Sequence, residues 1–295
     1  MTVMFLANRA TALAVFVAIA SHSGVAITPA LAGDASDWDE GLQSAVRLIA
    51  ARADGSGKTT VYRSAIEIKL NPGWKTYWRY PGDSGVPPVF DFSKSENVKS
   101  ATVLFPAPKR FADGAGGHSI GYKTGVLFPV RVVPKDPAKP AVLRVKMDYA
   151  VCEKLCMPAD ASLELKLTGK ESANDAAVVA AETLVPKVTP LGDSGTLAIR
   201  AAHKEAGADK AKDSKPKIVV DVAAPAGTTP LLFAEGPDMK WALPLPEAVP
   251  GAPAGLQRFA FELDGLPPGV AAAGATLRLT AVAGDQAVEA LFRLD

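Results

Sequence analysis

The chain has 295 residues, 48% of them hydrophobic and 21% charged, which is enough apolar material for one large or two ordinary domains. A formal net charge of +1, with no basic stripe, argues against a nucleic-acid partner. The 25 Gly and 24 Pro residues predict frequent turns and few long helices.

The N-terminus has the pattern of a secretory signal peptide. Arg9 precedes the apolar run Ala10–Ala20, and the small-residue pattern Ala30-Leu31-Ala32 follows. The run is too short to span the ~30 Å hydrocarbon layer of a membrane. We therefore predict that residues 1–32 are cleaved and that the mature protein is exported to the compartment outside the cytoplasmic membrane. Because that compartment is oxidising, two cysteines in one chain are expected to form a disulfide unless something reduces them.

Short strand-like segments with turn residues between them occupy the first half of the mature chain. The turn Asn71-Pro72-Gly73, for example, separates an alternating segment from an aromatic-rich one. This pattern predicts an antiparallel β-sandwich with one buried and one solvated face per sheet. The predicted strands are Ser44–Arg52, Val61–Leu70, Trp74–Tyr80, Val98–Phe105, Val126–Val133, Val142–Val151 and Ala161–Leu167.

A change of pattern follows near residue 170. The Ala-rich segment Glu171–Leu184 has helical spacing and ends before Pro186, which predicts a connecting helix. A charged stretch without periodicity then predicts a linker up to about residue 215. Five further strands define a second β domain: Lys217–Val222, Leu231–Glu235, Gln257–Leu263, Thr276–Val282 and Val288–Leu294. We thus expect an all-β chain with domains at 33–170 and 216–295, joined by a helix and linker over 171–215.

The cysteine pair Cys152/Cys156 is the most distinctive chemical feature. Three residues separate the two, a common hairpin loop length, so Cα atoms about 5.5–6 Å apart would permit a disulfide. A disulfide that closes so short a loop stabilises the folded state by only roughly 2 kcal/mol in the chain-entropy model. This small gain favours a role in reversible redox chemistry over a role in stabilisation. Lys154 would favour a thiolate by its charge, and Glu153 would oppose it. A purely structural disulfide remains an alternative.

A copper site is the other alternative. Cys152, Cys156, Met157 and the nearby Met147 offer soft sulfur ligands for Cu(I), and His118 would add an imidazole. His118 lies in the Gly-rich stretch Gly114–Gly121, where a single histidine is more often simply polar. A structural zinc site is not expected, because there is no second cysteine pair.

Four segments resemble the N-terminal periplasmic domain of the DsbD family, in the same order. They are Asn71–Asp83 (NPGWKTYWRYPGD), Gly85–Asp91 (GVPPVFD), Gly117–Tyr122 (GHSIGY) and Asp148–Pro158 (DYAVCEKLCMP). The resemblance covers about residues 40–170. The C-x3-C spacing is closer to ScsB-like members than to the DsbD domain itself, whose cysteines lie farther apart.

The resemblance implies an immunoglobulin-like sandwich whose cysteine pair, Cys152 and Cys156, is catalytic in thiol–disulfide exchange. The pair would accept reducing equivalents from a membrane electron-transfer protein or a thioredoxin-like donor and pass them to a disulfide-containing periplasmic protein. The chain would then be a component of a protein-disulfide reductase, with no cofactor. Family members of the full type carry membrane helices and a thioredoxin-like domain in the same chain. We expect neither in this sequence, so the electron donor is expected to be another polypeptide.

The matched motifs also suggest residues that act around the pair. Asp148 and Tyr149 would tune or shield the cysteines, as would Asp83 unless it is only a turn residue. Trp74 and Trp78 are expected in the core. A loop containing glycines 82, 85 and 114–117 is expected to cover the pair and to open on docking.

Overall fold

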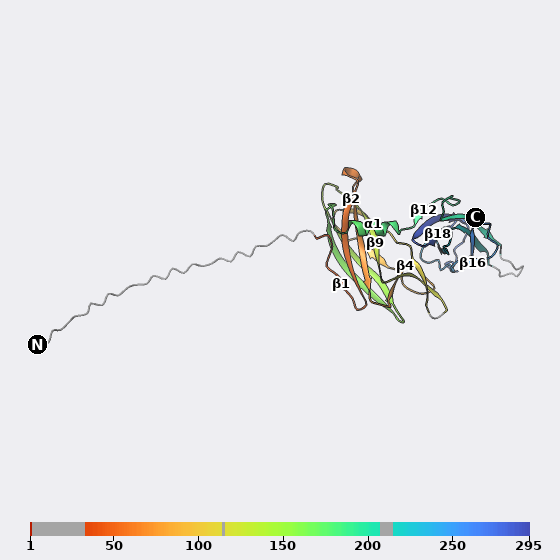
Figure 1. Cartoon of the computed structure of the whole chain (residues 1–295), viewed down its shortest axis with the longest axis horizontal. Helices are drawn as coiled ribbons and strands as arrows, with labels where there is room; N and C mark the ends of the chain where they lie inside the picture. The colour runs from red at the N-terminus through yellow and green to blue at the C-terminus, as the bar shows by residue number, and fades with distance from the viewer. Residues whose placement is uncertain (2–32, 114–115, 207–214) are drawn as a thin grey trace. The chain divides into compact units, whose positions relative to one another are not determined.

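The computed structural model describes residue 1 and residues 33–113, 116–206 and 215–295 (Figure 1). The predicted signal peptide lies outside the described residues, apart from Met1. In the described part the chain is mostly β-strand, with the short helix α1 (Asp175–Thr183) and the 3-10 turn η1 (Gly57–Thr59). This confirms the predicted all-β, immunoglobulin-like fold class.

The first half of the chain forms two facing sheets. One has five strands in the order β1-β2-β3-β9-β6: Asp39–Glu40, Ser44–Asp54, Val61–Leu70, Gly125–Pro134 and Val98–Val103. The other has the order β11-β10-β4-β8-β7, with β5 beside β10: Cys156–Leu167, Ala141–Cys152, Lys75–Gly82, His118–Lys123, Lys109–Ala112 and Val89–Asp91. All pairings in these two sheets are antiparallel.

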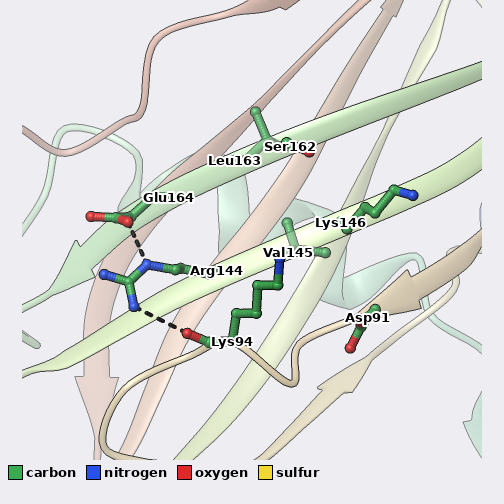
Figure 2. Close-up of a pocket in the computed structure, with 8 residues that line it drawn as sticks. All are labelled: Asp91, Lys94, Arg144, Val145, Lys146, Ser162, Leu163 and Glu164. Carbon is green, nitrogen blue, oxygen red and sulfur yellow. Dashed lines mark hydrogen bonds and ion pairs between the residues drawn. The ribbon is translucent and has the colours of Figure 1, made fainter.

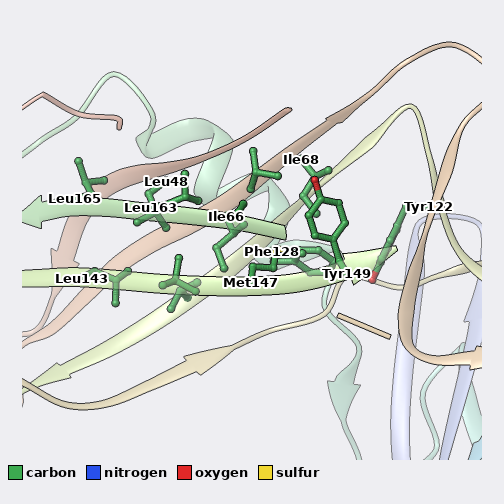
Figure 3. Packing of buried hydrophobic residues seen from close by; sticks show 14 of the residues in the cluster. Leu48, Ile66, Ile68, Tyr122, Phe128, Leu143, Met147, Tyr149, Leu163 and Leu165 are labelled. Carbon is green, nitrogen blue, oxygen red and sulfur yellow. The ribbon is translucent and has the colours of Figure 1, made fainter. Parts of the chain in front are cut away.

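The core of this sandwich follows from the alternation of apolar side chains. Along β10, Leu143, Val145 and Met147 are buried, whereas Lys146 and Asp148 between and beyond them are exposed. Figure 3 shows Leu143 and Met147 of β10 in one cluster with Ile66 and Phe128 of the opposite sheet. Phe128 lies fully buried at the centre, with the rings of Phe90, Phe105 and Tyr122 against it at centroid distances of 5.9, 5.1 and 5.4 Å.

Helix α1 packs on the outer face of the five-stranded sheet, so it is more than the connector that we predicted. Its buried residue Val178 joins a small apolar cluster with Ile49, Ala51 and Ala65. Glu182 pairs with Arg63 and, at 3.0 Å, with Arg131. The helix therefore shields a patch that would otherwise expose apolar strand residues.

The C-terminal part forms a second pair of sheets. Their orders are β12-β19-β18-β15 (Lys187–Val188, Gln286–Arg293, Thr276–Ala283, Leu231–Glu235) and β13-β14-β17-β16 (Ala198–Glu205, Lys217–Ala223, Gln257–Glu262, Glu247–Val249). Strand β13 occupies part of the segment predicted as a linker, which is a correction. It forms because Ala198, Ile199 and their neighbours pair with β14 and bury apolar side chains, a long-range contact that the charged composition of the segment conceals.

Apolar and charged contacts join the two pairs of sheets. Phe233, Val282 and Ala287 belong to the same buried cluster as the core of the first sandwich. Arg79 of β4 pairs with Glu235 at 2.8 Å and with Glu289 at 2.5 Å. Ala32–Asp295 accordingly form one compact unit. The division into two domains that fold separately stays a prediction.

The predicted strands lie close to the observed ones, with ends that differ by one to a few residues. The sequence patterns missed β8, which begins inside the Gly-rich stretch Gly114–Gly121. Its Gly121 packs against the backbone of Thr76, where a side chain has no room. No helix in the described part is long and apolar enough to cross a membrane.

Candidate functional site: a disulfide at the end of a hairpin

Strands β10 and β11 form a long antiparallel hairpin that ends at the cysteines. Their register runs without a shift from Ala141↔Leu167 to Cys152↔Cys156, so the cysteines face each other directly. A disulfide joins them, with Cα atoms 4.1 Å apart. This distance is shorter than the 5.5–6 Å that we expected, and it is nearest to the ~4.5 Å of a non-hydrogen-bonded pair of directly opposed strand residues.

The two sulfurs differ in their access to solvent. Cys152 is only 6% exposed and lies in a small buried cluster with Tyr77 and Ala150. Cys156, on the edge strand β11, is exposed. A thiolate that approaches from solvent therefore reaches Cys156, and Cys152 is the sulfur that leaves.

Tyr77 supplies the polar contact to the reachable sulfur. Its hydroxyl lies 3.1 Å from Cys156 Sγ, although its side chain is only 1% exposed. Burial raises the pKa of Tyr77, and the negative charge of Asp113 raises it further. The phenol therefore keeps its proton at neutral pH and can donate a hydrogen bond to a thiolate of Cys156. The sequence motif contains this residue, but nothing local assigns it to the cysteines.

The segment after β4 packs on the ring of Tyr77. Gly85 has a φ of +124°, and a Cβ on it would lie 2.2 Å from Tyr77 Cε1, so a side chain has no room here. This is part of the loop that we expected to cover the cysteine pair. In the described residues it lies over Tyr77 and leaves Cys156 exposed; positions 114–115 lie outside the described residues.

A buried lysine lies on the other side of Cys152. Lys75 faces Cys152 directly across the β4–β10 pairing and is only 8% exposed. Its ammonium donates to Ser119 Oγ at 3.2 Å, and Ser119 Oγ lies 3.2 Å from Ser84 Oγ. Ser84 in turn donates to Asp113 Oδ2 at 3.2 Å. Sequence reasoning missed this network, because its members come from four separate segments.

Tyr149 and Asp148 do not contact the disulfide. Tyr149 belongs to the core face of β10, and its hydroxyl lies 2.7 Å from Ser44 Oγ on the opposite sheet. Asp148 is on the same face as Cys152 but four residues away, and it is exposed beside Lys146 at 3.7 Å. Strand alternation explains both positions: only every second residue of β10 shares the face of Cys152.

Asp83 and Lys154 both lie in turns. The Asp83 carboxylate accepts the backbone N–H of His118 at 2.8 Å, so it fastens the turn after β4 to the start of β8. Lys154 lies exposed in the hairpin turn, next to the exposed Glu153. Trp78 is fully buried and Trp74 packs against the core, as expected.

The structure separates the ligands of the copper alternative. Met157 faces Val151 across the hairpin and packs against the core, and Met147 is fully buried there. Both lie on the face opposite the cysteines, since strand residues alternate. His118 lies at the start of β8, bonded through its backbone to Asp83. No group of three or more His, Cys, Asp or Glu side chains in the described residues is arranged to hold a metal ion.

A surface pocket of about 340 Å³ lies on the same hairpin, away from the cysteines. Lys146 and Ser162, which face each other in it, are six residue pairs from Cys152 and Cys156, about 20 Å along the strands. Figure 2 shows Arg144 bonded to Glu164 and to the backbone oxygen of Lys94. Arg144 and Glu164 of the pocket thus pair with each other, and the pocket is separate from the disulfide.

The chain is similar to known proteins both in sequence and in fold. Residues 47–168 match the family described as "Thiol:disulfide interchange protein DsbD, N-terminal". The fold is similar to the crystal structure of the N-terminal periplasmic domain of ScsB from Proteus mirabilis, with a TM-score of 0.66 and 19% identity. That match covers 89% of this chain and 98% of the other. No protein with a curated description matches the sequence.

Proposed function

We propose that the protein carries out thiol–disulfide exchange through Cys152 and Cys156, on the premise that residues 47–168 match the DsbD N-terminal domain family. The difference in exposure between the two sulfurs supports this most directly. Cys156 is exposed and Cys152 is buried beside it, which suits an exchange reaction in which one sulfur is attacked and the other leaves.

Reduction of the pair begins at the exposed sulfur. A donor thiolate attacks Cys156 Sγ, the bond to Cys152 breaks, and its electron pair leaves on Cys152 Sγ as a thiolate. A second donor thiolate attacks the donor sulfur of the mixed disulfide and releases Cys156. The donor becomes a disulfide, and the pair has gained two electrons.

Delivery of the electrons runs through the same sulfur. The Cys156 thiolate attacks one sulfur of a substrate disulfide, and the other substrate sulfur leaves as a thiolate. Cys152 then attacks Cys156 in the mixed disulfide, which frees the second substrate thiolate and restores the Cys152–Cys156 bond. The Tyr77 hydroxyl would stabilise the Cys156 thiolate between these steps, since hydrogen bonds to charged groups are among the stronger ones.

We infer that the exchange takes place in the periplasm. The predicted signal peptide and the periplasmic location of the ScsB domain with the same fold support this. The donor would be a membrane electron-transfer protein or a thioredoxin-like protein, and the acceptor a periplasmic protein with a disulfide. The copper alternative is not proposed further, because the methionines and His118 lie apart from the sulfurs.

The reduction potential of the pair tests the proposal. Equilibration of the full chain with glutathione buffers is expected to give a value between about −120 and −270 mV, the range of known exchange proteins. A value below about −300 mV is typical of a structural disulfide and would contradict the proposal. The protein would then be better described as a β-sandwich adaptor.

A further inference from the structure

The buried ammonium of Lys75 has no role in the mechanism described above. Burial of a cation is unfavourable unless something compensates it, and the side chain is only 8% exposed. The nearest compensation is a neutral hydroxyl, that of Ser119. The Asp113 carboxylate contributes from the far end of the hydrogen-bonded chain through Ser84. A charge held in such a position suggests that a second partner forms in another state of the protein.

Cys152 is placed to become that partner. It faces Lys75 directly in the antiparallel pairing of β10 with β4, and opposed residues on one face have Cβ atoms about 4.5–5.5 Å apart. Both side chains are buried, so little water screens a charge on one from a charge on the other. Cys152 is neutral in the disulfide and is the sulfur that receives the electron pair when a thiolate attacks Cys156.

We propose that Lys75 stabilises the thiolate of Cys152 when the disulfide is reduced, and thereby raises the reduction potential of the pair. The inference rests on the proposed exchange function. In the oxidised protein the ammonium is directed to Ser119 on β8, so on reduction it would turn toward Cys152 on the other neighbour of β4. A cation beside a thiolate stabilises it and makes it a better leaving group. Stabilisation of the reduced form makes a disulfide more oxidising, so the pair would accept electrons more readily from its donor.

The groups around Lys75 are consistent with this role. Burial lowers the pKa of Lys75, the carboxylate of Asp113 opposes that change, and the positive charge of Lys123 on β8 adds to it. Reduction would place a negative charge on Cys152, which is neutral in the disulfide. The Tyr77 hydroxyl serves the other sulfur, Cys156, so each thiolate would have its own stabilising group.

The variant Lys75→Gln separates charge from structure. Its amide can still donate a hydrogen bond to Ser119, so a merely structural role of Lys75 is preserved while the charge is removed. Equilibration of the full chain with reduced and oxidised glutathione measures the result. We expect the equilibrium constant for reduction to fall about tenfold, which corresponds to about 30 mV toward more negative potential. Reduction by glutathione should also be slower, because Cys152 becomes a poorer leaving group.

Two further variants complete the test. Lys75→Arg retains the positive charge and should remain within about threefold of the wild type, about 15 mV on the same scale. Lys99→Gln removes an exposed lysine from β6 of the other sheet and should leave the constant unchanged. If Lys75→Gln fails to fold, Lys75→Met provides the same neutral test. An equilibrium constant within twofold of the wild type in the folded neutral variant would overturn the role of Lys75.

The outcomes also separate this inference from the proposed function. If the wild-type pair stays oxidised throughout the glutathione series, the exchange function fails and the inference fails with it. If the wild-type pair exchanges with glutathione but the neutral variant behaves identically, only the role of Lys75 is wrong.

Discussion

Cys152 and Cys156 have different surroundings although they are only four positions apart. Cys156 lies on an edge strand and is open to solvent, whereas Cys152 lies between two strands and is covered. Reactivity of a thiol follows its access and its thiolate character. The two positions therefore predict separate roles in one reaction.

Single cysteine variants should show this difference. Cys152→Ser leaves the exposed Cys156 thiol, which we expect to react with Ellman's reagent at least about tenfold faster than the Cys152 thiol of Cys156→Ser. Each variant also abolishes catalytic exchange, since one sulfur is missing. Equal labelling rates under native conditions, with equal rates in denaturant as the control, would contradict the assignment of Cys156 as the entry point.

Tyr77→Phe should slow exchange without a large loss of stability. The ring still packs against Gly85, but the hydroxyl that lies 3.1 Å from Cys156 Sγ is removed. A hydrogen bond to a charged group contributes about 1.5–3 kcal/mol, and the higher nucleophilicity of a less stabilised thiolate offsets about half of its loss. We therefore expect the rate of attack by Cys156 on a disulfide to fall about threefold to tenfold near neutral pH. Tyr62→Phe is the matched control, because its hydroxyl bonds the distant Lys139 carbonyl. Equal rates in the two variants would argue against a role for Tyr77.

The hairpin β10–β11 holds the cysteines in place with or without their bond. Its strands pair over twelve residues each, and one face belongs to the main core. The disulfide only closes the end of this hairpin. We therefore expect the hairpin to keep the two sulfurs opposed while the bond between them breaks and forms.

Reduction of the disulfide should therefore leave the protein folded. The closed loop of about five residues predicts a loss of no more than about 2 kcal/mol in the free energy of unfolding. Urea denaturation with and without a reducing agent measures this loss. A reduced protein that lacks cooperative unfolding would show that the folded structure requires the disulfide.

Strand β4 connects the candidate site to the C-terminal sheets. Lys75 and Tyr77 lie beside the cysteines, whereas Arg79 pairs with Glu235 and Glu289 of the C-terminal part. One strand thus carries both the residues beside the cysteines and an ion-pair contact with the second pair of sheets.

Arg79→Met should destabilise the protein strongly. The side chains of Arg79, Glu235 and Glu289 are only 19%, 13% and 10% exposed, so loss of the cation leaves two buried carboxylates without this partner. Removal of one partner from a buried ion pair costs about 3–5 kcal/mol. The exposed pair of Arg52 with Glu171 provides the control, and Arg52→Met should cost less than about 1 kcal/mol. Similar losses of unfolding free energy in the two variants would contradict a stabilising role of the buried ion pairs of Arg79.

Alkaline pH should destabilise the fold as a whole. Burial raises the pKa of every tyrosine in the chain, and that of Tyr80 to about 12: Tyr62, Tyr77, Tyr80, Tyr122 and Tyr149. The folded state favours the protonated phenols. Their contribution to the free energy of unfolding is therefore complete below the ordinary tyrosine pKa of 10.0 and is lost as the pH rises toward 12. Urea midpoints at pH 8 and pH 11.5 measure the change. The urea midpoint should be lower at pH 11.5 than at pH 8. A constant midpoint would contradict a contribution of the buried tyrosines.

Local patterns predict much of this protein. Alternation of apolar residues over Val61–Leu70 and Val142–Val151 predicts strands, because a strand buries every second side chain. The short spacing of Cys152 and Cys156 predicts a hairpin and a disulfide, since neighbours in the chain meet at a turn. The same reasoning predicts the all-β fold class.

The surroundings of the sulfurs depend instead on contacts between distant segments. Tyr77 is 79 positions from Cys156, and Lys75 meets Cys152 only because β4 pairs with β10 in one particular register. A shift of one residue would turn both side chains to the other face. That register is set by how all the strands pack around one core, so a short sequence motif contains these residues without revealing their partners.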